Sequence, residues 1–188
     1  MAESVVEFAE YDETRPEGSP LSFAVRPATP DDAPAVALLD AERNRVDPDS
    51  ILPYVRRDLE AIASGDLLRT CAVATSDGTE VGYARAAWKD YGASPDARKL
   101  PSGWYLTGLV VSPRWRRQGV GLALTLHRLE HLISAGVREV YYFANAENRV
   151  TIALHERPGF EEISRDIVVP GVAFHGGVGI LYRWRLHP

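Results

Sequence analysis

The first half of the chain places apolar residues at strand spacing, then at helix spacing. Residues 21–26 alternate apolar and polar positions, as a half-buried strand does. Residues 33–44 carry apolar side chains on one helical face after the acidic start Asp31-Asp32, and residues 47–50 interrupt this pattern. A second helix is expected to follow and to end at residues 64–65. The pattern therefore predicts one strand followed by two helices.

The next two strands are expected to form a hairpin. The apolar runs 67–75 and 80–88 flank Ser76-Asp77-Gly78-Thr79. An Asp-Gly pair suits the tight primed turns that join antiparallel strands. Residues 89–103 follow, rich in Pro, Gly, Ala and charge, and they predict a long loop that could cover a site.

Strands alternate with helices in the second half of the chain. The aromatic and β-branched run 104–111 predicts a strand, and the leucine-rich face after it predicts a helix that ends at Gly136. A further helix is expected at 146–157, and further strands are expected at 138–144, 160–169 and 178–186. A hairpin followed by alternating strands and helices predicts an α/β fold with a mixed sheet.

The length and composition fit one soluble domain. The chain has 188 residues, of which 45% are hydrophobic, and this content suffices for a single core. Residues 1–20 are acidic and contain three Pro or Gly, so a flexible extension is expected before a single domain over 21–188. The sequence shows no signal-peptide pattern and no apolar run that could span a bilayer, so we expect a cytoplasmic protein without a membrane partner.

The net charge and the single cysteine argue against nucleic-acid binding and against thiol chemistry. The net charge of −5 disfavours a nucleic-acid binder. Cys71, the single cysteine of the chain, lies in an apolar strand and is expected to be an inert core thiol. The sequence also offers no pair of metal ligands at useful spacing, so no metal is expected.

A glycine-containing basic turn connects the strand 104–111 to the helix after it. Gly119 and Gly121 let the backbone approach a ligand closely, and the free N–H groups of a first helical turn attract anions. Arg116 and Arg117 add positive charge at the same place. The turn is no P-loop, because no Gly-Lys-Ser/Thr follows, and no dinucleotide fingerprint, because the third glycine is absent. It predicts a phosphate-rich ligand.

This turn, Arg116-Arg-Gln-Gly-Val-Gly121, resembles the acetyl-CoA signature Arg/Gln-x-x-Gly-x-Gly/Ala of the GCN5-related N-acetyltransferases, the GNAT family. A second motif follows in the family's order, because residues 145–160 are similar to its Asn-rich stretch that ends in Leu-Tyr-Glu-Lys-x-Gly-Phe. The resemblance covers residues 21–186 and implies the GNAT fold. That fold is a mostly antiparallel sheet of about seven strands, splayed between the fourth and the fifth and flanked by about four helices.

The resemblance implies that acetyl-CoA is the cosubstrate. The main chain of residues 109–111 would bind the pantetheine arm, and N–H groups of residues 117–122 would bind the pyrophosphate. A main-chain N–H near Leu109 or Val110 would also stabilise the oxyanion of the reaction. The alternative is that residues 109–111 form a core strand without a role in binding. The implied cofactor-binding residues are Leu109, Val110, Val111, Arg116, Arg117, Gln118, Gly119, Val120, Gly121, Leu122, Asn148 and His155.

His155 stands where the family usually has the tyrosine that protonates the departing CoA thiolate. An imidazolium with an unperturbed pKa of ~6.5 is a stronger acid than a phenol with a pKa of ~10. We therefore expect His155 to be the general acid, the alternative being a polar helix residue packed beside Glu156 and Arg157. Asn148 is either a pantetheine ligand or a helix cap.

The proton acceptor is not fixed by the resemblance. Many family members carry a glutamate just ahead of the segment that is Leu109-Val-Val111 here, but this chain has Thr107-Gly108. Glu42 and Asp90 are the leading candidates, followed by Asp40 and Glu80. Alternatively, holding the amine close to the thioester is enough.

Aromatic side chains near the expected site suit a cationic or amphipathic amine. The candidate acceptor-binding residues are Trp88, Tyr91, Trp104, Tyr105 and His175 of the loop 170–177, and core packing is the alternative for the aromatic ones.

The leading hypothesis is an N-acetyltransferase for a primary amine of a small molecule, such as an aminoglycoside-like, polyamine or amino-acid-like compound. The amine would attack acetyl-CoA directly in a ternary complex, and a homodimer is left open. A protein N-terminal or lysine acetyltransferase is one alternative. The other is an acyl-CoA-binding sensor with weak or no catalysis, favoured by the missing strand carboxylate and by the histidine in place of tyrosine.

Overall fold

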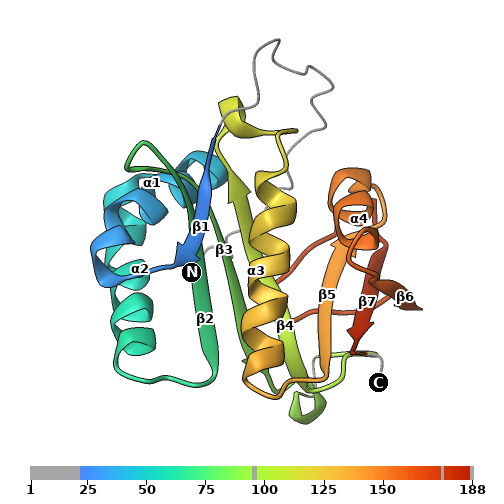
Figure 1. The fold of residues 1–188 in the computed structure, drawn as a ribbon. Helices are drawn as coiled ribbons and strands as arrows, with labels where there is room; N and C mark the ends of the chain where they lie inside the picture. The colour runs from blue at the N-terminus through green and yellow to red at the C-terminus, as the bar shows by residue number, and fades with distance from the viewer. Residues whose placement is uncertain (1–21, 95–96, 175, 187–188) are drawn as a thin grey trace. The chain divides into compact units, whose positions relative to one another are not determined.

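The computed structural model describes residues 22–94, 97–174 and 176–186. The described chain forms two compact units, which we call the N-terminal unit (22–87 and 107–131) and the C-terminal unit (88–106 and 132–186). The strands follow the order β1-β2-β3-β4-β5-β7-β6 in a seven-stranded sheet (Figure 1), which confirms the predicted α/β fold class. The expected extension 1–20 lies outside the described residues, and the single domain over 21–188 stays a prediction.

The N-terminal unit contains the first strands and three of the helices in the described chain. Its elements are β1 (Ala24–Pro27), α1 (Ala33–Asn44), α2 (Pro48–Ala63), β2 (Arg69–Ser76), most of β3 (Thr79–Lys89), the second half of β4 (Gly103–Val111) and most of α3 (Val120–Ser134). The bounds of α1 coincide with the prediction. The helix α2 begins inside the stretch that was expected to break the pattern, because the side chain of Asp47 caps it by accepting from the N–H of Asp49 at 3.0 Å.

The hairpin of β2 and β3 confirms the predicted primed turn. Asp77 and Gly78 have φ angles of 48° and 75°, as a type I′ turn requires at both central residues. The two strands pair antiparallel from Ser76 opposite Thr79 to Arg69 opposite Ala87. The turn sets the register at its own end of the hairpin, and a bulge between Ala74 and Thr75 shifts that register by one residue farther along the strands.

Both faces of this sheet are covered within the N-terminal unit. Cys71 and Val73 pack in one apolar cluster with Val36 and Leu59 of α1 and α2. Their neighbours Ala72 and Ala74 pack in another cluster with Val120 and Leu124 of α3. Because successive strand residues face opposite sides, α1 and α2 cover one face and α3 covers the other.

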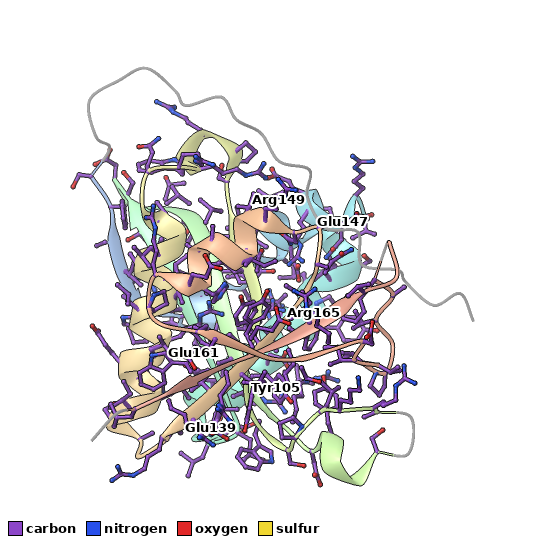
Figure 2. The ribbon with its side chains drawn as sticks, turned by 90° about the vertical axis from the view of Figure 1, so that its right-hand side faces the viewer. Tyr105, Glu139, Glu147, Arg149, Glu161 and Arg165 are labelled. Carbon is purple, nitrogen blue, oxygen red and sulfur yellow. The ribbon has the colours of Figure 1, made fainter. Side chains whose placement is uncertain are left out.

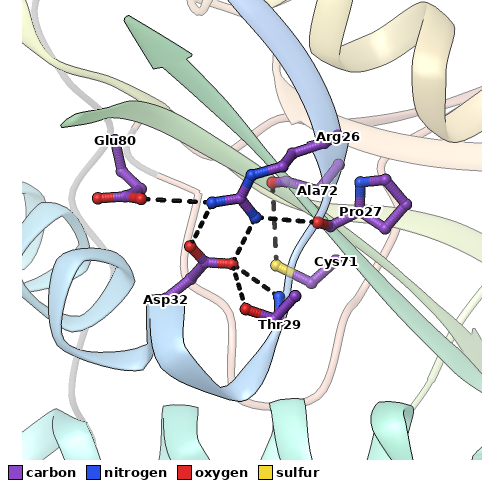
Figure 3. A network of polar contacts seen from close by, with 7 residues as sticks. All are labelled: Arg26, Pro27, Thr29, Asp32, Cys71, Ala72 and Glu80. Atoms are coloured by element: carbon purple, nitrogen blue, oxygen red, sulfur yellow. Dashed lines mark hydrogen bonds and ion pairs between the residues drawn. The ribbon is translucent and has the colours of Figure 1, made fainter. Parts of the chain in front are cut away.

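A buried carboxylate anchors β1 to the short 3₁₀ turn Pro30–Asp32. Both oxygens of Asp32 accept hydrogen bonds of 2.7 Å from the guanidinium of Arg26, and one also accepts from the N–H of Thr29 at 2.7 Å (Figure 3). Glu80 lies 3.4 Å from the same guanidinium. Burial alone would raise the pKa of Asp32, but the hydrogen bonds from Arg26 and Thr29 outweigh it and hold that pKa at about 2.

The C-terminal unit is built around the parallel pair of β4 and β5. Its elements are the first half of β4, β5 (Glu139–Asn145), α4 (Arg149–Glu156), β6 (Glu161–Arg165) and β7 (Gly179–Arg185). Trp104 lies opposite Val140 and Tyr105 opposite Tyr141 in the parallel pair, whereas β7 pairs antiparallel with both β5 and β6.

Two elements of this unit are shorter than the sequence predicts. The helix α4 begins at Arg149 and not at Ala146, because Oδ1 of Asn148 accepts from the N–H of Thr151 at 3.1 Å and caps the helix there. The strand β6 ends at Arg165, since Asp166 takes a left-handed φ of 54°. None of the described helices has both the length and the apolar character needed to cross a membrane.

Candidate functional site

The turn before α3 has the backbone shape of an anion-binding loop. Arg117 and Gly119 take left-handed φ angles of 64° and 87°, and α3 begins at Val120. The first helical hydrogen bond that leaves this turn runs from the N–H of Ala123 to the carbonyl of Gly119. The N–H groups between these two residues thus precede the helical ladder, where anions bind.

The side chains of this turn hold its shape and add charge. The Nε of Arg116 donates to the carbonyl of Val111 at 3.2 Å, and the amide of Gln118 donates to the carbonyl of Arg114 at 2.9 Å. Arg116 and Arg117 are exposed, as is Gly119. The turn thereby presents two cations and a glycine backbone to solvent at a helix start.

The segment Leu109–Val111 uses its side chains for packing. Val110 is buried in the cluster with α1 and α2, and Leu109 and Val111 pack against the cluster with Val120 and Leu124. The strand leaves regular geometry just before this segment, because Gly108 has a φ of 45°. Packing uses the side chains, whereas a cofactor would use the main-chain groups, so the two interpretations are compatible.

A polar cluster that we call the Asp40 cluster lies beside Gly108. The hydroxyl of Tyr83 donates to Oδ1 of Asp40 at 2.7 Å, and the guanidinium of Arg85 lies 3.6 Å from Oδ2. A Cβ added at Gly108 would lie 3.6 Å from the ring of Tyr83 and 3.9 Å from Cδ of Arg85. A Cβ at position 108 would thus be in ordinary van der Waals contact with Tyr83 and Arg85.

The other candidate proton acceptors are exposed or form polar contacts of their own. Glu42 is exposed on α1, and Glu80 pairs with Arg26. Asp90 is exposed in the C-terminal unit and accepts a hydrogen bond from the hydroxyl of Ser102. Asp40 is the carboxylate that contacts Tyr83, the residue whose ring lies next to Gly108.

His155 lies in an aromatic cluster of the C-terminal unit. It is 3% exposed, and its ring stacks on Tyr142 with a centroid separation of 4.1 Å and meets the edge of Phe160 at 5.5 Å. Its Nδ1 lies 2.8 Å from the carbonyl of Thr151 and must carry a hydrogen there, which leaves Nε2 as the atom that can exchange a proton. The imidazole is thus held firmly in one orientation.

Asn148 and the predicted acceptor residues also belong to the C-terminal unit. The capping bond of Asn148 uses only its side-chain oxygen. Trp88 and Trp104 line a pocket with a volume of about 340 Å³, and Trp88 is exposed. The pocket wall includes Glu139 of β5, which is labelled in Figure 2. Glu139 accepts hydrogen bonds from Tyr141 and Arg185.

The two tyrosines of the acceptor prediction are packed against each other. Tyr105 is completely buried, and its hydroxyl donates to the carbonyl of Pro101 at 2.7 Å. Tyr91 meets it edge to face at 5.1 Å. Tyr105 therefore offers no surface to an acceptor in this structure. His175 lies outside the described residues.

One buried polar residue of the site region has no counterpart in the sequence predictions. Arg128 of α3 is completely enclosed, and its guanidinium reaches main-chain carbonyls of β3 and β4. It stands four residues after Leu124 and four before Leu132, on the buried face of the helix. That spacing is the signal that could have identified it, because a charged residue on an apolar helix face is unusual.

The family model described as the acetyltransferase (GNAT) family matches residues 35–160 of the 188. The match includes most of α1, the whole of α2 and α3, and both motifs named above.

Curated relatives have several different acceptors. An aminoglycoside N(6′)-acetyltransferase type 1 of Salmonella typhimurium is 31% identical over 111 residues, which cover 58% of this chain and 74% of the relative. A mycothiol acetyltransferase of Nocardiopsis dassonvillei is 36% identical over 64 residues, covering 34% of this chain and 19% of the relative. A ribosomal protein bS18-alanine N-acetyltransferase of Escherichia coli is 39% identical over 57 residues, which cover 30% of this chain and 38% of the relative. The matches thus span well under half the length of the last two relatives.

Solved structures share the fold across most of the chain. An acetyltransferase of the GNAT family from Streptococcus pneumoniae has a TM-score of 0.66 at 19% identity, covering 88% of this chain and 100% of the other. A ribosomal-protein-alanine N-acetyltransferase from Brucella melitensis has a TM-score of 0.64 at 22% identity, covering 87% and 99%. With the match over residues 35–160 and this shared fold, the chain belongs to the GNAT family of acetyltransferases.

Proposed function

We propose that the protein is an acetyl-CoA-dependent N-acetyltransferase that acetylates a primary amine of a small molecule. The observation that carries this proposal is the turn 116–121, which combines exposed arginines, a left-handed Gly119 and the start of α3. These features suit a pyrophosphate, because backbone N–H groups and the helix dipole act on the same anion.

The cofactor would extend from this turn along β4. N–H groups of residues 117–122 would bind the pyrophosphate, with Arg116 and Arg117 as counter-charges. The main chain of Leu109, Val110 and Val111 would bind the pantetheine amides, and one of these N–H groups would hold the developing oxyanion. Asn148 is the further proposed contact. A GNAT neighbour, the PaiA N-acetyltransferase of Thermoplasma acidophilum, was solved in complex with coenzyme A, which supports the choice of cofactor.

The reaction is a direct transfer. The amine nitrogen attacks the thioester carbonyl carbon, the C–N bond forms, and the C–S bond breaks as the oxyanion collapses. The departing CoA thiolate would take its proton from Nε2 of His155, whose ring is held by Thr151 and Tyr142. The proton lost by the amine goes to a carboxylate or through water to solvent.

We favour Asp40 as the carboxylate that meets the acceptor ammonium. It is bonded to Tyr83, and the Asp40 cluster lies beside the strand residue Gly108, where many family members carry a glutamate. Glu42 and Asp90, the leading candidates from the sequence, remain the alternatives to be tested against it.

The acceptor proposal rests on the match to the aminoglycoside N(6′)-acetyltransferase of Salmonella typhimurium. That relative acts on aminoglycosides by its name, and 111 residues of this chain align with it. The alternative, acetylation of a protein N-terminus, is favoured by the shorter match to the bS18-alanine enzyme. Trp88 and Trp104 are the proposed aromatic contacts of the acceptor.

Release of free CoA thiol from acetyl-CoA tests the proposal. The protein would be assayed with a panel of aminoglycosides, polyamines and amino acids, and in parallel with a peptide that begins with alanine. Thiol release that depends on a small amine supports the proposal, whereas release with the peptide alone supports the protein acetyltransferase. Binding of acetyl-CoA without release for any acceptor would identify a sensor module and contradict the enzyme.

A further inference from the structure

Arg128 is a cation enclosed in the N-terminal unit, and it has no counter-ion among the described residues. Its side chain is the largest among the fully buried ones of the described chain. Its guanidinium contacts are all to neutral acceptors, and no carboxylate of the described residues pairs with it. Desolvation by burial lowers the pKa of Arg128 to about 9. An unpaired buried charge is costly, so an apolar side chain would be the cheaper choice at this position if packing were its only task.

The guanidinium connects α3 to two neighbouring strands. Nη1 donates to the carbonyl of Arg85 in β3 at 2.8 Å and to the carbonyl of Thr107 in β4 at 3.3 Å. Nη2 donates to the hydroxyl of Thr125 at 3.1 Å, one turn earlier in α3. The hydroxyl of Thr125 in turn lies 2.9 Å from the carbonyl of Gly121. A single planar group thus ties one helix to the main chain of both strands.

The contact with β4 falls at the residue where that strand becomes irregular. Thr107 directly precedes Gly108, whose φ of 45° lies outside the strand region. A main-chain carbonyl at such an irregularity cannot rely on the regular ladder for its hydrogen bonds. Nη1 of Arg128 supplies a donor at that point. The next residues, Leu109 to Val111, are those that would bind the pantetheine arm in the proposed function.

The same helix carries the phosphate turn at its start. Arg128 lies eight positions after Val120, which is about 12 Å along the helix. The path of hydrogen bonds runs from the guanidinium to Thr125 and on to Gly121, a residue of the turn. α3 therefore fixes the phosphate turn at one point and the irregular part of β4 at another.

We propose that Arg128 is a positioning residue that holds Thr107 and Gly108 from α3, and so sets the main-chain N–H groups of residues 109–111 relative to the phosphate turn. It touches neither cofactor nor acceptor. Its role is to make the pantetheine segment and the pyrophosphate turn one rigid surface. This inference rests on the proposed function, because it requires acetyl-CoA to use both segments.

The test compares two probes on the same variants. Arg128→Met keeps an unbranched side chain and removes every donor, whereas Arg128→Lys keeps the charge and can reach one carbonyl. Leu129→Ala is the matched control, since Leu129 is buried on the same helix and its truncation removes core packing but no hydrogen bond of the guanidinium. Affinity is measured for acetyl-CoA and for 3′-phospho-ADP, the part of CoA that lacks the pantetheine arm.

Arg128→Met should weaken acetyl-CoA binding by about tenfold and leave 3′-phospho-ADP binding nearly unchanged, since only the arm loses its preset partners. Arg128→Lys should recover part of the loss and serves as the test if the methionine variant fails to fold. Leu129→Ala should lower the unfolding temperature and change neither affinity.

Two results overturn the inference while leaving the proposed function intact. One is a folded Arg128→Met protein that binds acetyl-CoA as tightly as the original chain. The other is an equal loss for both probes, which would mean general destabilisation. If the unaltered chain binds neither 3′-phospho-ADP nor acetyl-CoA, the proposed function itself fails, and the inference fails with it.

Discussion

The hydroxyl of Tyr83 donates a hydrogen bond of 2.7 Å to Oδ1 of Asp40, and this bond joins β3 to α1. The pair lies beside Gly108, so a carboxylate is present next to the strand even though the strand itself carries none. Tyr83 is completely buried, and desolvation raises the pKa of its hydroxyl well above its usual value. The phenol therefore stays neutral and orients the carboxylate without competing for its negative charge.

Asp40→Asn should lower kcat by about tenfold to a hundredfold with little change in the KM for acetyl-CoA, because it removes the group that meets the acceptor ammonium. Steady-state kinetics with a reactive amine would measure both constants. Glu60→Gln, an exposed change on α2, is the control for a general effect of charge. If Asp40→Asn keeps the kcat of the unaltered chain while Glu42→Gln or Asp90→Asn lowers kcat, the proton acceptor is one of those carboxylates and not Asp40.

Gly119→Ala tests the phosphate turn through its backbone alone. A Cβ at Gly119 would meet no atom within 4 Å, but its φ of 87° strains any other residue. Gly65→Ala is a matched control, because Gly65 has a φ of 94°, equally open space, and a position after α2. Both variants should lose about 1 kcal/mol of unfolding free energy in chemical denaturation.

Gly119→Ala alone should also weaken acetyl-CoA binding, by about tenfold. Equal acetyl-CoA affinity in both variants, measured by titration calorimetry, would argue against the turn as the pyrophosphate site.

His155→Phe tests the proposed general acid while preserving its packing. A phenyl ring can stack on Tyr142 as the imidazole does, so the fold should survive. We expect kcat to fall about a hundredfold and the affinity for acetyl-CoA to change little. His155→Tyr, which restores the hydroxyl typical of the family, should recover part of the rate.

Tyr142→Phe is the control for this cluster. The hydroxyl of Tyr142 is buried without a hydrogen-bond partner in the described chain, so its removal should leave both stability and rate intact. If His155→Phe turns over as fast as the unaltered protein, the imidazole is a core residue and the acid is some other group.

The pair of Arg26 and Asp32 predicts an acid-sensitive stability. The folded pKa of Asp32, about 2, lies below the value of ~3.9 expected for an unfolded chain. The carboxylate therefore stabilises the fold above pH ~4, and this contribution of about 2 kcal/mol is lost as the pH falls from ~4 toward 2. Asp32→Asn should be less stable at pH 7 by a similar amount and should show a flatter stability curve below pH 4.

Urea unfolding at several pH values measures this effect. Asp31→Asn, at the exposed neighbouring position, should behave as the unaltered chain does. Parallel pH curves for Asp32→Asn and the unaltered chain would mean that Asp32 does not carry the acid sensitivity.

Local chemistry made much of the fold predictable from the sequence. The Asp77-Gly78 turn and the bounds of α1 follow from residues within a few positions of each other. Where local signals competed, the boundaries moved. The pair Asp47-Pro48 is compatible both with the end of a helical pattern and with the start of a new helix, and the structure shows a helix start. The cap made by Asn148 makes α4 shorter than predicted.

The parts that could not be predicted depend on distant contacts. The spacing from Leu124 and Leu132 places Arg128 on the apolar face of α3, but nothing in the sequence indicates that its guanidinium reaches carbonyls of β3 and β4. The bond between Tyr83 and Asp40 joins residues 43 positions apart, and only the folded sheet brings them together. The aromatic residues that were predicted to bind the acceptor also differ in burial for this reason. Tyr105 is enclosed by its neighbours, whereas Trp88 is exposed.

Transfer of a labelled acetyl group tests the central claim most directly. The protein would be incubated with acetyl-CoA carrying an isotopic label in the acetyl group and with the amine panel, and the products would be analysed by mass spectrometry. We predict that one class of small amine gains the labelled acetyl group in equal amount to the free CoA released, and that Gly119→Ala slows this transfer. Bound acetyl-CoA without any labelled amine, or no bound acetyl-CoA at all, would contradict the account.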